Sequence, residues 1–137
     1  MRLNPYLLFN GQCEEAFQFY AKCLGGSIGA MLPFAGTPAE GSVPEQWRNK
    51  VMHARLDLGD QVLMGSDAMA GHYQQPASFS VALHYNDVKE AERVFSQLSE
   101  DGEITMPLEK TFWAARFGMF TDRYGIPWMV NCEQPGS

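Results

Sequence analysis

The strongest constraint on this chain is a pair of amphipathic helical segments, each embedded in the same order of strand-like segments. In the first, the apolar residues recur at spacings of three and four, the period of one α-helix face: Cys13, Ala16, Phe17, Tyr20 and Leu24. Charged and amide side chains fill the opposite face, and two consecutive glycines end the segment. A helix over 13–24 is therefore expected.

The second helical segment repeats this pattern. Its apolar face consists of Val88, Ala91, Phe95 and Leu98. Either Asn86 or Asp87 supplies the N-cap. Placing one segment over the other aligns like residues: Leu8 with Leu83, Glu15 with Glu90, Ala16 with Ala91, and Tyr20 with Phe95. The match indicates an internal duplication, and the alternative is a plain α+β sandwich without one.

Each half of the chain reads as strand, helix, strand and hairpin, so we expect an α+β fold of two βαβββ modules. The expected elements are Pro5–Phe9, Cys13–Leu24, Ser27–Leu32, Val51–Leu58 and Gln61–Ser66 in the first module, then Phe79–Tyr85, Val88–Ser99, Ile104–Glu109, Ala114–Thr121 and Ile126–Cys132 in the second. The modules cover residues 1–68 and 78–133, joined by a linker over 69–77, within one domain of 137 residues.

A βαβββ module covers one sheet face with its helix and leaves the other face open. Two such modules are expected to form a curved mixed sheet around a cleft, the natural place for a ligand. The segment Phe34–Asn49, rich in Gly, Pro and Ala, is expected to be a mobile loop near this pocket.

Composition excludes several functional classes. The net charge of −6 offers no basic footprint for nucleic acid and disfavours anionic membrane surfaces. No apolar run approaches the roughly 20 residues that span a bilayer, and no signal peptide is recognisable. Three cysteines without a CxxC pair argue against disulfides and thiolate zinc sites. We expect a cytoplasmic protein, with Cys23 and Cys132 buried and unreactive.

Three segments carry a family resemblance: FNGQCEEAFQFY…LGG (Phe9–Gly26), VMHARLDLGDQVLMGSDA (Val51–Ala68) and KTFWAARFGMFTDRYGIPWMVN (Lys110–Asn131). Together with the element order, they resemble the vicinal-oxygen-chelate superfamily, and within it the PhnB-like branch of the glyoxalase/bleomycin-resistance proteins. The resemblance covers about residues 5–132. It implies a homodimer with the cleft near the interface. In the superfamily's enzymes it also implies a divalent metal that acts as a Lewis acid on bound substrate.

The positions that the resemblance assigns to the metal ligands hold unsuitable residues. They are Pro5, Met64, Ser80 and Met129. Proline has no ligating side chain, a serine hydroxyl is a poor ligand, and thioethers suit soft metals rather than hard divalent ones. We therefore predict no cofactor and no metal of the usual kind.

Two histidines leave an alternative open. His53 and His84 are expected on sheet faces that line the cleft, and an aspartate such as Asp57 or Asp67 could complete a two-His-one-carboxylate site. The protein would then be a metal-dependent lyase, isomerase or dioxygenase. Otherwise the histidines are polar pocket residues, hydrogen-bonded sheet residues or metal-free acid–base groups. No catalytic residue is fixed by spacing, and Asp67 is expected to cap a turn.

The leading hypothesis is a protein that binds a small, partly apolar organic molecule without the usual metal. The expected pocket residues are Leu7, Phe9, His53, Met64, Ser80, His84, Trp113, Phe117 and Met129. Trp128 is expected to pack under a helix, and Lys110 and Arg116 to be solvated charges that could steer an anionic ligand. A pure interaction module is the third possibility.

The PhnB-like branch often carries the label demethylubiquinone methyltransferase, which the residues argue against. A nucleotide-binding glycine loop lies between a strand and a helix. Here the glycine-rich run Gly25–Gly29 follows a helix and enters a strand. We therefore do not expect an S-adenosylmethionine methyltransferase.

Overall fold

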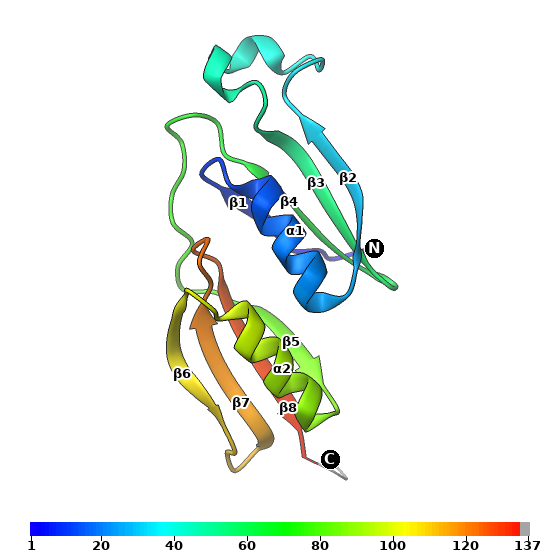
Figure 1. Cartoon of the computed structure of the whole chain (residues 1–137), viewed down its shortest axis with the longest axis vertical. Helices are drawn as coiled ribbons and strands as arrows, with labels where there is room; N and C mark the ends of the chain where they lie inside the picture. The colour runs from blue at the N-terminus through cyan, green and yellow to red at the C-terminus, as the bar shows by residue number, and fades with distance from the viewer. Residues whose placement is uncertain (135–137) are drawn as a thin grey trace. The chain divides into compact units, whose positions relative to one another are not determined.

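The computed structural model describes residues 1–134, which divide into two compact units at the junction between Gln74 and Gln75. Each unit contains one α-helix and one four-stranded mixed sheet (Figure 1). The predicted two-module α+β architecture is thereby confirmed in its element order. The described residues contain no helix of the length and apolarity needed to cross a membrane.

Unit 1 consists of β1 (Tyr6–Phe9), α1 (Cys13–Leu24), β2 (Ser27–Pro33), β3 (Val51–Leu58) and β4 (Gln61–Asp67). The strand order in its sheet is β1-β4-β3-β2, with β1 parallel to β4 and the other pairs antiparallel. The last strand of the unit therefore lies between its first and third strands. The helix ends as predicted, at Gly25 in the left-handed conformation with φ 79°.

The core of unit 1 forms where α1 packs on its sheet, chiefly on β3 and β2 and also on β4. Phe9 is fully buried and its ring meets the rings of Phe17 and Tyr20, with centroids 6.1 and 6.3 Å apart. Gly65 of β4 is required for this packing, because a Cβ there would lie 2.7 Å from the carbonyl oxygen of Leu7 and 2.8 Å from the Phe17 ring.

The segment 34–49, predicted to be a loop, includes some regular structure. It contains two short 3₁₀ helices, η1 (Glu40–Ser42) and η2 (Glu45–Trp47), and buries the side chains of Phe34 and Val43. The Trp47 indole N–H donates to the carbonyl oxygen of Ala68 at 3.0 Å. These contacts anchor the segment on unit 1.

Asp67 also differs from expectation, because it joins two elements rather than capping a turn. It is the last residue of β4 and is 3% exposed. Its Oδ1 accepts from the backbone N–H of Cys13 at 3.0 Å, and its Oδ2 from that of Val51 at 2.8 Å. One buried carboxylate thus holds the first residue of α1 against the first residue of β3. Burying a charge is tolerated here because both oxygens are hydrogen-bonded.

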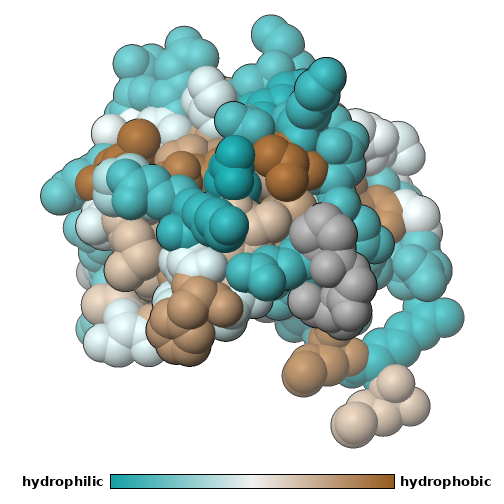
Figure 2. Space-filling view, turned by 90° about the horizontal axis from the view of Figure 1, so that it is seen from below, coloured by the Kyte–Doolittle hydropathy of each residue, from teal (hydrophilic) through white to brown (hydrophobic). Residues whose placement is uncertain are grey.

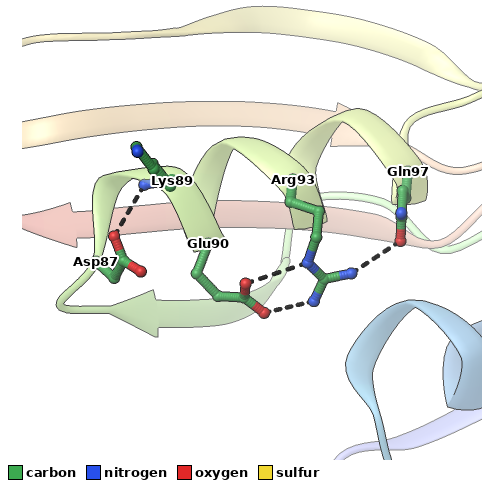
Figure 3. Close-up of polar contacts among 5 residues, drawn as sticks. All are labelled: Asp87, Lys89, Glu90, Arg93 and Gln97. Atoms are coloured by element: carbon green, nitrogen blue, oxygen red, sulfur yellow. Dashed lines mark hydrogen bonds and ion pairs between the residues drawn. The ribbon is translucent and has the colours of Figure 1, made fainter.

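Unit 2 consists of β5 (Val81–Tyr85), α2 (Val88–Leu98), β6 (Glu103–Glu109), β7 (Ala114–Thr121) and β8 (Pro127–Glu133). Its strand order is β5-β8-β7-β6, with β5 parallel to β8. Asp87 is the N-cap of α2, and its carboxylate accepts from the Lys89 backbone N–H at 3.1 Å (Figure 3). The predicted strand over Phe79–Tyr85 begins two residues late, at Val81, so Ser80 lies just outside the sheet.

The outer surface of α2 carries a chain of polar contacts. The Glu90 carboxylate bonds the Arg93 guanidinium, which also donates from Nη1 to Gln97 Oε1 at 3.0 Å (Figure 3). These side chains are solvent-exposed, as expected for residues three and four apart on an outer helix face. The opposite face of α2 buries Ala91, Val94, Phe95 and Leu98 against the sheet.

The β7–β8 turn is organised by one buried carboxylate. Asp122 Oδ1 accepts from the backbone N–H groups of Tyr124 and Ile126 at 2.8 and 3.0 Å. Its Oδ2 accepts from the indole N–H of Trp128 at 2.8 Å. Trp128 is 1% exposed, which confirms its predicted place in the core.

Candidate functional site

The side chains of unit 2 divide between a face covered by α2 and a face that the helix does not cover. Gly118 identifies the covered face, because a Cβ there would lie 2.7 Å from the Phe95 ring of α2. Phe117 and Met119 flank it in β7 and therefore point to the other side. We call this other side the open face of unit 2.

Strand register arranges the open face in two rows of neighbouring side chains. One row runs Ala82, Met129, Met119 across β5, β8 and β7, and the next runs His84, Asn131, Phe117. None of these six residues is buried. The rows bring together three of the predicted pocket residues, namely His84, Phe117 and Met129.

The polar part of the open face is a histidine–asparagine pair. The side-chain N–H of Asn131 Nδ2 points at His84 Nδ1, 3.5 Å away, a long hydrogen bond. When the Asn131 N–H donates to Nδ1, the imidazole proton is on Nε2. The exposed edge of His84 can therefore offer an N–H donor, and the Asn131 carbonyl oxygen an acceptor.

Aromatic side chains extend the open face at the start of β7. The Trp113 ring meets the Phe117 ring at 5.5 Å between centroids and the Phe112 ring at 4.7 Å, both edge to face. Trp113 is 51% exposed and Phe112 is 91% exposed. The predicted pocket residue Trp113 therefore adjoins the open face, whereas Ser80 precedes β5 and lies outside the two rows.

Unit 1 has a corresponding open face, which carries two further predicted residues. Tyr6, Met64 and Arg55 are neighbours across β1, β4 and β3. The Tyr6 hydroxyl lies 3.2 Å from His53 Nδ1, and the two rings stack with centroids 5.9 Å apart. His53 and Met64 thus share one surface in unit 1.

Leu7 and Phe9 do not belong to an open face, which corrects the sequence-based assignment. Leu7 pairs with Gly65, whose missing Cβ faces Phe17 of α1, and Phe9 packs on the same helix. Both side chains are in the core, at 3% and 0% exposure. The residues that actually face outward from β1 are Tyr6 and Leu8, each 47% exposed.

Tyr6, Met119 and Asn131 were missed as open-face residues. The signal that could have found them is strand alternation: Asn131 lies between the buried Val130 and Cys132. Tyr6 precedes the buried Leu7 in the same way. Once one buried residue per strand is known, its neighbours are assigned to the opposite face.

The donors present do not fit the divalent metal implied by the family resemblance. Pro5 and Met64 are neighbours in unit 1, where the Met64 N–H donates to the Pro5 carbonyl oxygen at 3.1 Å. Met129 lies beside Ala82 in unit 2. Among residues 1–134, no three His, Cys, Asp or Glu side chains gather closely enough to hold a metal ion. His53 in unit 1 and His84 in unit 2 therefore each lack, within their own unit, the second histidine and the carboxylate that the alternative metal site requires.

The cysteines are poorly placed for nucleophilic chemistry. Cys13, Cys23 and Cys132 are all buried with free thiols, which confirms the expectation for the latter two. Burial, reinforced by the negative charges of Asp67 and Glu14, raises the pKa of the Cys13 thiol far above its usual range. The reactive thiolate is thereby suppressed.

On the face seen in Figure 2, hydrophobic residues lie as separate patches among hydrophilic ones. Exposed large hydrophobic side chains include Phe79, Ile104 and Met106 of unit 2, in addition to Phe112 and Trp113. Apolar patches rimmed by polar residues commonly mark binding surfaces.

Comparison with known proteins places this arrangement among relatives. The sequence model of the Glyoxalase/Bleomycin resistance protein/Dioxygenase superfamily matches residues 2–130. Protein YjdN of Escherichia coli is 33% identical, over 98% of this chain and 99% of its own length. The crystal structure of PA1353 from Pseudomonas aeruginosa is 50% identical with a TM-score of 0.89, covering 98% of both chains. The PhnB protein from Bacillus cereus is 25% identical with a TM-score of 0.80, over 96% of this chain and 99% of its own.

Proposed function

This chain belongs to the Glyoxalase/Bleomycin resistance protein/Dioxygenase superfamily, and on that premise we propose that it binds a small, partly apolar organic molecule on the open face of unit 2. The binding needs no divalent metal. The observation that carries the proposal is the pair of side-chain rows, which brings Met119, Met129 and Phe117 onto the same sheet face as the His84–Asn131 pair.

The chemistry of these rows favours a ligand with one polar edge and one apolar body. Methionine side chains adapt to irregular apolar shapes, and the Phe117 and Trp113 rings offer edges and faces for a planar group. The imidazole N–H and the Asn131 carbonyl oxygen can bond one acceptor and one donor of the ligand. Covering about 100 Å² of apolar surface would contribute about 2.5 kcal/mol before the costs of binding.

The residues at the family's metal-ligand positions, Pro5, Met64, Ser80 and Met129, support the proposal that binding needs no divalent metal. A proline, two thioethers and a serine hydroxyl supply no imidazole or carboxylate donor. Elemental analysis of protein purified without an affinity-tag metal is expected to find almost no metal per subunit, with no gain after adding Ni²⁺, Zn²⁺, Mn²⁺ or Fe²⁺. One bound divalent ion per subunit, and an activity that depends on it, would overturn this part.

The ligand itself is testable by a thermal-shift screen of small aromatic and partly apolar compounds on the full chain. A compound at about 100 times its Kd should add about 2.7 kcal/mol of stability. A hit is expected to weaken with His84→Ala or Phe117→Ala and to be unaffected by His72→Ala. His72 is a matched control because it is an exposed histidine outside the rows. If no compound stabilises the protein, or if His72→Ala weakens a hit as much as His84→Ala, the proposed site is wrong.

We also propose a homodimer, as the family resemblance implies. Sedimentation equilibrium is expected to give twice the mass of one chain at micromolar concentration. A single-chain mass throughout that range would contradict the dimer without bearing on the binding face of unit 2.

A further inference from the structure

A second feature of unit 2 lies apart from the two rows of the open face. It is a hollow of about 260 Å³ lined by Lys110, Ala115, Arg116 and Gln134. This volume is below the roughly 300–1,000 Å³ of sites for drug-sized molecules. The hollow therefore suits a small chemical group.

Arg116 enters the hollow from the side of the sheet opposite to the open face. It pairs with Cys132, which is fully buried, and precedes Gly118 by two residues on the face covered by α2. Phe117, between them, points the other way. A ligand in the hollow would thus contact side chains different from those of the proposed organic-ligand site.

Within the described part of the chain, the two cations of the hollow have no acidic partner. Three other arginines, Arg55, Arg93 and Arg123, each form an ion pair with a carboxylate. Among the described residues 1–134, neither Lys110 nor Arg116 has a carboxylate within 4.0 Å. Two cationic side chains therefore line one concave site, and no carboxylate of residues 1–134 lies beside either of them.

The donors around the hollow are already held in place. Arg116 is partly buried, and its Nη1 donates to the carbonyl oxygen of Ala115 at 2.7 Å. A guanidinium has five N–H donors, so four remain. No buried side-chain nitrogen among residues 1–134 lacks a partner, so the Nε and Nη2 atoms of Arg116 reach solvent. Gln134 Nε2 donates one N–H to the Thr111 carbonyl oxygen at 3.4 Å and retains a second.

We propose that this hollow binds a small oxyanion group, such as a phosphate or a carboxylate, between Arg116 and Lys110. The planar guanidinium matches two oxygens of such a group, and the lysine adds a point charge. The second N–H of the Gln134 amide supplies a neutral donor. This inference does not depend on the proposed function, because it uses none of the open-face residues.

The test is a titration of the full ¹⁵N-labelled chain with inorganic phosphate at fixed pH, with sodium chloride adjusted to hold the ionic strength constant. Saturable shifts are expected in the amide signals of residues 110–116 and in the Gln134 side-chain signal. Arg116→Gln is expected to weaken phosphate binding about tenfold or more. Arg116→Lys keeps the charge but loses the two-pronged geometry, so it should also weaken binding.

Matched variants separate the site from general electrostatics. Lys22→Gln, in the last turn of α1, removes the same charge from the other unit and is expected to leave binding unchanged. Lys110→Gln is expected to weaken phosphate binding, and this variant tests the site if the Arg116 variants do not fold. His84→Ala leaves it intact, which separates this site from the open face. Acetate in place of phosphate tests a carboxylate ligand, and saturation by either anion supports the proposal. Shifts that saturate with neither anion, or an equal loss in Lys22→Gln, would overturn it.

Discussion

Replacing Asp122 with asparagine is expected to destabilise unit 2 by about 3 kcal/mol, although the side chain keeps its size and shape. The carboxylate is 3% exposed and accepts three N–H groups, two from the backbone and one from Trp128. An asparagine has a single acceptor oxygen, so its amino group must face at least one of these donors. Losing a hydrogen bond to a charged group costs about 1.5–3 kcal/mol, and the unpaired donor adds to this cost.

A double-mutant cycle isolates the contact with the indole. Trp128→Phe removes the indole donor that faces Oδ2, so asparagine can then give its oxygen to Tyr124 and Ile126 without opposing the indole N–H. In that background Asp122→Asn should cost only about 1 kcal/mol. The difference, about 2 kcal/mol, is the expected coupling between the two residues.

Urea unfolding followed by far-UV circular dichroism measures the four stabilities. The backbone amide signals of Cys13 and Val51, followed by NMR in the same urea series, give a separate record of unit 1, which the substitutions do not touch. If the two substitutions add to within about 0.5 kcal/mol, the carboxylate does not hold the indole as described and the reasoning fails.

Four further outcomes follow from the packing and the buried groups. Gly65→Ala should destabilise unit 1 by about 1–3 kcal/mol, since its Cβ would lie 2.7 Å from the carbonyl oxygen of Leu7. The control is Gly41→Ala, where a Cβ would have no neighbour within 4 Å. Its free energy of unfolding in urea should change by less than about 0.5 kcal/mol. The buried Cys13 thiol should resist a thiol reagent at pH 8 until urea is added, and fast labelling of the native protein would contradict its burial. Because burial raises the pKa of Cys13 while the unfolded thiol ionises near pH 9, stability should fall above pH 9 by up to about 1.4 kcal/mol per pH unit, and less steeply in Cys13→Ala. Asp67→Asn should destabilise unit 1 by about 2–3 kcal/mol in the same urea assay, since both of its oxygens accept a backbone N–H.

The helices were predictable because their signals are local. The period of apolar residues, the Asp87 cap and the Gly25 stop each act within one or two turns of the chain. Strand existence was equally readable from alternation, and β3 and β7 have the predicted bounds, Val51–Leu58 and Ala114–Thr121.

The orientation of β1 could not be predicted from the sequence. Alternation divides a strand into two sets of residues but does not state which set meets the helix. In β1 both sets are apolar or aromatic, so Leu7 and Phe9 were assigned to a pocket although they form the core. The choice is decided by a distant residue, Gly65, which leaves room for Phe17 only on one side.

The role of Asp67 was hidden for a similar reason. Its partners Cys13 and Val51 are remote in the sequence, and nothing nearby distinguishes such a carboxylate from a turn residue. The hollow at Arg116 depends in the same way on Lys110 and Gln134, which meet only after β6, β7 and β8 have assembled.

The strand orders have a consequence for how the chain is made. In both units the strand synthesised last, β4 or β8, occupies an inner position of the sheet and pairs on both sides. When the nascent chain has left the ribosome as far as β7, β5 therefore has no strand to pair with, because its neighbour in the sheet is β8. Since pairing of β5 must wait for β8, unit 2 cannot acquire its sheet progressively from one edge to the other. Trimming the chain from its C-terminal end into β8 would remove the middle of the sheet rather than fray its margin.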